Sequence, residues 1–224
     1  MTNTHDFFFS PEGGTTPAEL ASAMAPQAEP GHFDELRGQA LPRDASNAIN
    51  SIAARAKLTR AWAQFFENLG LDGFTDLNHR TTSVQRQIRD NGVTYNVYAD
   101  ADGPQRPWSL DLFPLILTPA EWVQIEAGVL QRMQLLNRVL ADVYGPQDLL
   151  QTGLLPPALV HGHPGYLQGM HGVLPVGGHH LHIAAFDLAR GPDGQWAVVT
   201  QRTQAPSGLG YLLENRLTIS RQFP

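Results

Sequence analysis

Apolar residues recur at steps of three and four along one long stretch of the chain, and this pattern predicts a helix from Pro119 to Val143. The stretch opens with the letters TPAEW. Thr118 can cap the first turn, Pro119 suits the first helical position, and Glu121 completes a capping box. The letters YGP should end the helix, because glycine and proline stop helices. We expect the apolar stripe to belong to the core; it comprises Trp122, Ile125, Val129, Met133, Leu136, Leu140 and Val143.

Shorter patterns predict the remaining elements. One or two helices are expected from the apolar spacing between Ile49 and Leu69, and another helix runs through Ile88 and stops at the Asn-Gly pair 91–92. Alternation predicts a strand over 93–98, with a second extended segment reaching Leu117. A short helix fits the letters PQDLLQTG, and two late strands, about 180–189 and 196–201, are joined by the turn RGPDGQ. This mixture predicts an α+β (α/β-like) fold with a long core helix and a mixed sheet.

Composition narrows the functional classes. The chain of 224 residues is 42% hydrophobic and has no cysteine. The lack of cysteine excludes disulfides, cysteine–zinc sites and thiol nucleophiles and favours a cytoplasmic location. A formal net charge of −6 argues against nucleic acid as the main partner. Neither a secretory leader nor a membrane-spanning stretch is visible. Residues 1–32 mix small, polar and proline residues without an apolar period, so we expect a mobile segment there.

Histidines form the most visible cluster of chemically active side chains. Six of the nine lie between His161 and His182, and His180 and His182 would share one face of a strand. A metal site needs further ligands that the sequence does not bring together, so we favour solvated or core histidines and expect no bound zinc. A serine-nucleophile site at Ser207 is disfavoured, because the letters APSGLG lack the first glycine of the G-x-S-x-G pattern.

Polar residues are dense near the end of the chain, over 198–216. Asp187 leaves one predicted strand, and Gln201 with Arg202 leaves the next. Carboxylate and amide oxygens are suitable ligands for Mg²⁺, and a guanidinium suits phosphate. The following letters APSGLGY could line an anion with backbone amides, although such loops are more often structural turns.

Five ordered stretches resemble the N-terminal half of the circularly permuted ATP-grasp type 2 family, which is similar to the synthetase part of glutathionylspermidine synthase. They are NGVTYNVYADADGPQRPW, LLNRVLADVYGPQDLL, GLLPPALVHGHPGY, FDLARGPDGQWAVV and RTQAPSGLGYLLENR. The resemblance runs from about Phe33 to Pro224. It implies an ATP-grasp fold and the ATP- and Mg²⁺-dependent joining of a carboxylate to an amine through an acyl-phosphate.

The resemblance also implies roles for individual residues. Arg202 would act catalytically on phosphate or acyl-phosphate. The implied nucleotide contacts are Arg202, Gln204, Ser207, Gly208 and Gly210, and the implied metal ligands are Asp187, Gln201, Glu214 and Asn215. For the last two an alternative stays open, since they could instead lie in a helix that anchors this wall of the site.

Two departures from the family pattern bear on activity. Gln201 stands where the family usually has aspartate, which keeps an oxygen ligand but removes its charge. Lys57 is the single lysine, although ATP-grasp enzymes hold phosphates with lysines. We therefore expect residues 33–224 to be an incomplete domain of a truncated or split ligase, inactive alone. Its implied partners are nucleotide, a small-molecule or peptide substrate, and a missing C-terminal half or full-length relative; the alternative is a non-catalytic, partner-binding remnant.

Overall fold

A computed structural model describes residues 15–40, 57–95 and 106–223 of the chain. The chain divides into two compact units, each of which is described by itself. The first, called the helical unit, comprises residues up to Ile116, the turn Gly191–Gln195 and the segment Leu209–Pro224. The second, called the hairpin unit, comprises Leu117–Arg190 and Trp196–Gly208. The chain thus returns to the helical unit near its end.

Among its described residues, the helical unit contains four helices and two very short strand pairs. Its helices are α1 (Pro17–Met24), α3 (Arg60–Thr75), α4 (Leu77–Asp90) and α8 (Leu209–Gln222). Strand β1 (Phe33–Asp34) pairs antiparallel with β2 (Gln39–Ala40), and β3 (Thr94–Tyr95) pairs with β4 (Arg106–Pro107). Helix α3 bends at Gly70, whose φ of 70° is unsuited to other residues.

Two hydrophobic clusters stabilise the helical unit. The first joins α1 to α3 through Ala21, Trp62 and Phe66, with the Trp62 and Phe66 rings stacked 5.7 Å apart. The second joins α4 to the segment that follows β4, through Val84, Ile88 and Leu112. Side chains of α8 pack against this second cluster, so the last helix of the chain is held on α4 by apolar contact.

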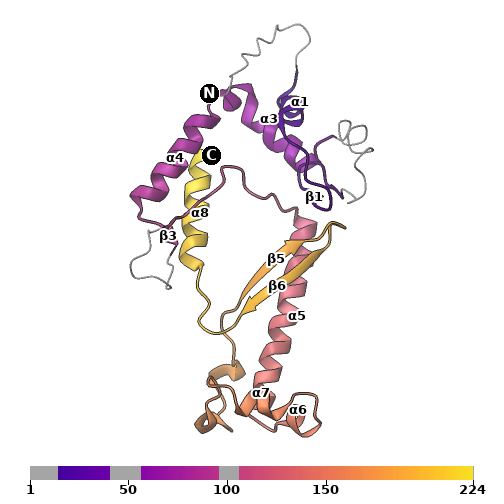
Figure 1. Cartoon of the computed structure of the whole chain (residues 1–224), viewed down its shortest axis with the longest axis vertical. Helices are drawn as coiled ribbons and strands as arrows, with labels where there is room; N and C mark the ends of the chain where they lie inside the picture. Colours follow the sequence, from indigo (N-terminus) through magenta and orange to yellow (C-terminus); the bar gives the residue numbers. More distant parts are fainter. Residues whose placement is uncertain (1–14, 41–56, 96–105, 224) are drawn as a thin grey trace. The chain divides into compact units, whose positions relative to one another are not determined.

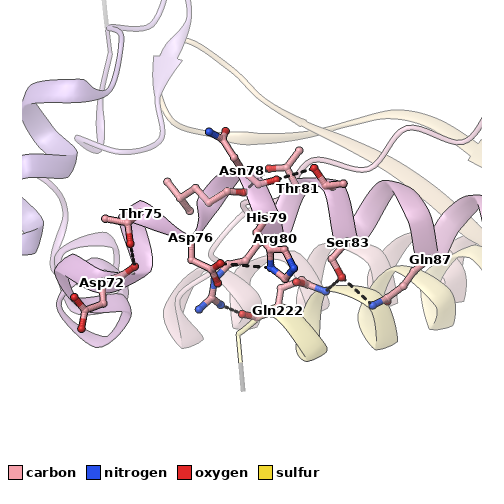
Figure 2. Close-up of polar contacts among 12 residues, drawn as sticks. Asp72, Thr75, Asp76, Asn78, His79, Arg80, Thr81, Ser83, Gln87 and Gln222 are labelled. Atoms are coloured by element: carbon pink, nitrogen blue, oxygen red, sulfur yellow. Dashed lines mark hydrogen bonds and ion pairs between the residues drawn. The ribbon is translucent and has the colours of Figure 1, made fainter. Parts of the chain in front are cut away.

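Polar groups reinforce the contact between α4 and α8, as Figure 2 shows. The guanidinium of Arg80 donates a hydrogen bond to the backbone carbonyl of Gln222. The amide side chain of Gln222 in turn donates to Ser83 Oγ at 3.4 Å. These contacts satisfy polar groups at the C-terminal end of α8, where helix carbonyls otherwise lack partners.

A buried ion pair ties α1 to the loop that follows it. Arg37 and Asp34 have side chains only 3% exposed, and Arg37 Nη1 lies 3.0 Å from Asp34 Oδ2. The same guanidinium donates to the backbone carbonyls of Ser22 and Ala25, at 3.2 Å each. Arg37 therefore satisfies carbonyls at the end of α1 as well as the buried carboxylate.

The hairpin unit combines one long helix with a two-stranded antiparallel sheet (Figure 1). Helix α5 spans Pro119–Val143, followed by α6 (Asp148–Gln151), α7 (Pro157–His161) and the short helices η2 (Gln168–Met170) and η3 (Val176–Gly178). Strand β5 (Ala185–Arg190) pairs with β6 (Trp196–Arg202). The connecting turn has Gly194 at a φ of 79°, as a tight hairpin turn requires.

The α+β class is confirmed, and α5 begins and ends where its capping box and YGP letters predict. The predicted mixed sheet is not found among the described residues, because their strands form three separate antiparallel pairs. The α5 stripe is also less buried than predicted: Ile125 and Val143 are buried, but Trp122 is 53% exposed. Helix α1, which lies within the segment 1–32, begins with the same threonine–proline–glutamate cap as α5. The patterns predicted at 49–56 and 96–98 lie outside the described residues.

Candidate functional site

An irregularity in the β5–β6 ladder decides which predicted site residues share a face. Asp187 pairs with Thr200, whereas Leu188 pairs with Val198, so Val199 is an extra residue in β6. A bulge of this kind shifts the alternation of side chains along the strand. Beyond the bulge, Asp187, Thr200 and Arg202 lie on one face of the hairpin, and Gln201, opposite Phe186, lies on the other.

Asp187 is the centre of a polar group on the first face. Both terminal nitrogens of Arg202 donate to its carboxylate, each at 2.9 Å, and the Thr200 hydroxyl donates to Oδ2 at 2.9 Å. The hydrogen bond from Thr200, followed by that from Arg202, holds the pKa of Asp187 below its ordinary value, because both stabilise the charged form. The Arg202 and Asp187 side chains are 51% and 46% exposed, so both remain reachable from solvent.

The second face of the hairpin, which carries Leu188 and Val198, lies opposite α5. A space of about 480 Å³ lies between helix and hairpin, lined by Ile125, Gly128 and Arg132 on the helix side and by Leu188, Trp196 and Val198 on the strand side. Arg190 pairs with Glu121, and its guanidinium lies 4.5 Å from the ring centroid of Trp196, one of the lining residues. The α5–hairpin arrangement is therefore fixed by contacts at the start of the helix.

The loop after β6 carries three of the predicted nucleotide contacts, Gln204, Ser207 and Gly208. All three are exposed. Ala205 has a φ of 43° and Gly208 a φ of 116°, so the loop departs from extended geometry at two positions. Left-handed backbone at a non-glycine residue costs free energy, and such positions are enriched at binding sites. Their exposed backbone makes this loop suitable for approach by an anionic group.

The other predicted site residues belong to the helical unit, in α8. Asn215 Oδ1 accepts a hydrogen bond from Trp108 Nε1 at 3.0 Å, and Glu214 accepts one from the Asn91 amide. In the same helix the Tyr211 hydroxyl donates to the backbone carbonyl of Thr94 at 2.7 Å. Glu214 and Asn215 thus hold α8 against neighbouring elements of its own unit, and they lie in a different unit from Asp187. Gly210 lies in the first turn of α8.

The described residues include no group of three or more histidine or carboxylate side chains that could hold a metal ion by themselves. Mg²⁺ does not require such a group, because it is commonly bound through one or two carboxylates together with substrate phosphates. Asp187 and the Thr200 hydroxyl are oxygen donors of this kind, and both oxygens of the carboxylate accept hydrogen bonds from Arg202 or Thr200.

Sequence reasoning missed two parts of this arrangement. Thr200 is the first cause of the lowered Asp187 pKa, yet a threonine in a strand gives no recognisable signal. The contact between Glu121 and Arg190 joins residues far apart in the chain, and the sequence shows Glu121 only as a capping residue. Among the histidines, His180 is held at its backbone, where its N–H donates to Asn137 Oδ1 at 2.8 Å.

Comparison with known proteins gives one family match and several relatives. Residues 114–224 match the family described as circularly permuted ATP-grasp type 2. An uncharacterised protein of Mycobacterium tuberculosis is 36% identical over 171 residues, which cover 73% of this chain and 19% of that protein. An uncharacterised protein of Synechocystis is 39% identical over 147 residues, covering 66% of this chain and 30% of that protein. The chain thus spans less than a third of the length of either relative.

Proposed function

From the premise that residues 114–224 match the circularly permuted ATP-grasp type 2 family, we propose that the chain supplies part of the site of an ATP- and Mg²⁺-dependent carboxylate–amine ligase. The match supports a general ATP-grasp, ligase-like function. The likeness to the synthetase part of glutathionylspermidine synthase, the formation of an amide or peptide bond and a cytoplasmic setting belong to this proposal. The chain spans less than a third of the named relatives. We therefore propose that the rest of the site lies in the regions of those relatives outside the matched segments.

The observation that carries the proposal is the exposed pair formed by Asp187 and Arg202. Its two partners are the chemical groups that a metal–nucleotide complex needs, a carboxylate for the metal and a guanidinium for phosphate. Exposed ion pairs contribute little free energy, so a charged ligand can displace one partner from the other. In the proposed complex Asp187 would hold the metal, and Arg202 would hold the phosphate or acyl-phosphate.

Bound Mg²⁺ would neutralise phosphate charge during transfer of the γ-phosphoryl group to the substrate carboxylate. The chain's own contribution is orientation and charge. Thr200 holds the Asp187 carboxylate through a hydrogen bond and lowers the pKa of that carboxyl. Arg202 then stabilises the negative charge that develops on the transferred group.

The remaining predicted contacts keep their proposed roles. Gln204, Ser207 and Gly208 would bind the nucleotide through the exposed loop after β6, and Gly210 through its backbone. Gln201 is proposed as a neutral metal ligand; because its side chain leaves the opposite face from Asp187, sharing one ion requires the end of β6 to twist. Glu214 and Asn215 can become ligands only by giving up their bonds to Asn91 and Trp108.

The test is nucleotide binding by the full chain. Phosphorus NMR of ATP with excess Mg²⁺ should show broadening that reports a dissociation constant in the millimolar range, about 4 kcal/mol of binding. Arg202→Ala and Asp187→Ala should each abolish it, whereas Arg138→Ala, an exposed arginine on α5, should not. Equal ATP binding by all three variants would remove this face of the hairpin from the site.

A second candidate function is favoured by one observation. Many large apolar side chains of the hairpin unit are exposed, and both hydrophobic clusters found in the described residues lie in the helical unit. A non-catalytic chain that binds a protein partner would use such a surface. If ATP binding is absent while binding to a partner is retained, this second function replaces the first.

A further inference from the structure

The segment between Asp148 and Asp187 contains no aspartate, glutamate, lysine or arginine, although such residues make up 16% of the chain. It is also strongly exposed. Leu174 and Val176 are 88% and 97% exposed, on either side of Pro175. Single exposed apolar residues are ordinary, but two nearly uncovered ones within a charge-free segment are not. Residues 173–179 are called the apolar tip.

Hydrogen bonds fix the apolar tip at both ends. Before it, the Gly172 N–H donates to the backbone carbonyl of Tyr144 at 2.7 Å. After it, the N–H groups of His180 and Leu181 donate to Asn137 Oδ1, at 2.8 and 3.2 Å. Both anchors are located in the C-terminal part of α5, so hydrogen bonds hold the tip at both ends, and a segment held in this way loses less conformational entropy on binding than a free one.

Aromatic rings strengthen the second anchor and the base of the tip. The Tyr144 ring stacks on Tyr166 at 5.2 Å and on His180 at 6.2 Å, with both planes nearly parallel to it. The Tyr144 hydroxyl also accepts a hydrogen bond from the backbone N–H of Leu167. The contacts that hold the tip are thus separate from its exposed side chains, and Leu174 and Val176 can be changed without removing an anchor.

The hairpin unit has few buried apolar residues of its own. Among the described residues, its buried hydrophobic side chains are Ile125, Val143 and Leu150. Burying a leucine or valine side chain is worth roughly 1.5–3 kcal/mol, so covering the tip would release substantial free energy. Cores of protein interfaces are likewise apolar and depleted of charged residues.

We propose that the apolar tip is a docking site. Leu174 and Val176 insert into an apolar pocket of the polypeptide that, in the full-length relatives, lies outside the segment matched by this chain. The length of the relatives argues for this occupant. The matched segments make up 19% and 30% of the named relatives, so in those proteins the equivalent segment is joined to a much larger polypeptide. The lack of any lysine or arginine in the segment disfavours an anionic lipid surface, because such surfaces are bound through those residues.

The test uses the full chain together with the Synechocystis relative's polypeptide outside the segment that this chain matches, co-expressed with an affinity tag on the second. We expect the chain to co-purify with it in equal amounts. The double change Leu174→Glu with Val176→Glu should lower the affinity at least tenfold by placing charges in an apolar pocket. Leu71→Glu, at a residue 51% exposed on α3, is the matched control and should bind like the parent.

Two further measurements test whether the double variant is misfolded and whether the tip instead binds a second copy of the chain. Hydrogen exchange should show Gly172, His180 and Leu181 equally protected in the parent and the double variant, since their anchors are unchanged. Sedimentation of the chain alone should give a monomer. Absence of co-purification, equal loss in the Leu71 variant, self-association broken by the tip variant, or binding to lipid vesicles would each overturn the proposal. Docking of the tip does not depend on ATP binding, so a negative result in either experiment leaves the other proposal unaffected.

Discussion

Arg202 holds the carboxylate of Asp187 with both of its terminal nitrogens, each 2.9 Å from an oxygen, across the end of the β5–β6 hairpin. Neither residue is buried, so the pair adds little to stability and is available for exchange with charged ligands. The pair is positioned by the bulge at Val199, since the shifted register brings the two side chains to the same face. A fold feature therefore determines which of the predicted residues can act together.

The Thr200 hydroxyl should govern the charge state of Asp187. Thr200→Val removes the first cause of the lowered pKa and should raise the pKa of Asp187 toward its ordinary value. Carbon-detected NMR titration of the Asp187 carboxylate measures this directly. Thr203→Val, in the loop beyond β6, is the control and should leave the Asp187 titration unchanged. An unaltered titration in Thr200→Val would show that the hydroxyl does not donate to this carboxylate.

Acid should weaken the α5–hairpin contact through Glu121. Burial raises the pKa of this carboxyl, but hydrogen bonds from Thr118 and the contact with Arg190 outweigh burial and lower it. A group with a lowered folded-state pKa binds fewer protons when folded. Its stabilisation is therefore complete above the ordinary value of 4.5 and is lost as the pH falls through the folded value.

The measurement is hydrogen exchange of β5 and α5 amides at several pH values between about 6 and 3, corrected for intrinsic exchange rates. Protection should decline toward the acid end in the parent and vary less with pH in Glu121→Gln. Glu126→Gln, at an exposed position of the same helix, should behave like the parent. A parent-like decline in Glu121→Gln would assign the acid sensitivity to another group.

The long helix and the end of α4 were predictable because their signals are local. Thr118, Pro119 and Glu121 act within one turn. Gly92 ends α4 through its own φ of 64°, a conformation that glycine adopts readily after a helix. Helix α1 has the same cap at Thr16, but its eight residues are too few to show an apolar period. Short helices depend on packing, which for α1 is provided by α3.

The sequence places Asp187 and Arg202 at the ends of two predicted strands, but it could not show which side chains share a face of the hairpin. Asp187 and Arg202 were identified from polar residues at two strand ends, and the structure pairs them. The bulge at Val199 depends on how the whole hairpin packs, so the sequence could not show that Gln201 leaves the opposite face. Nor could spacing along the chain reveal that Glu214 and Asn215 bond to Asn91 and Trp108, more than a hundred residues earlier.

Arg37 should be among the most sensitive positions of the helical unit. Arg37→Met leaves the Asp34 carboxylate buried without its charged partner and removes hydrogen bonds to the end of α1. Breaking a buried ion pair in this way costs about 3–5 kcal/mol. Hydrogen exchange of α1 and α3 amides should report the loss, and adding Asp34→Ala should restore part of it. Arg86→Ala, at an exposed position of α4, serves as the control and should have no effect.

Asn215 should stabilise the helical unit even in the absence of nucleotide. Asn215→Ala leaves the Trp108 indole N–H without this acceptor, which costs about 1 kcal/mol. Urea unfolding followed by the indole N–H resonance of Trp108 should shift to lower urea, while Arg216→Ala, an exposed neighbour, should not shift it. If Asn215 is instead a metal ligand, Mg²⁺ with ATP should move the Trp108 indole resonance, and stability without ligand should be unchanged by Asn215→Ala.

Gly128 lies in the interior of α5, where no packing contact requires a glycine. A Cβ added there would meet nothing within 4 Å. Glycine in a helix interior is about 1 kcal/mol less favourable than alanine, so Gly128→Ala should stabilise α5 by up to that amount. Thermal unfolding of the full chain should show a higher midpoint.

A matched comparison separates this propensity effect from the space beside Gly128. Ala127→Gly, at the neighbouring exposed position, should destabilise α5 by a similar amount, because it makes the opposite change in helix propensity at a residue outside that space. Gly128 lines the space between α5 and the hairpin, whereas Ala127 is not among its lining residues. If Gly128→Ala fails to stabilise while Ala127→Gly destabilises as expected, another group approaches the backbone at Gly128 in solution, and the space is filled.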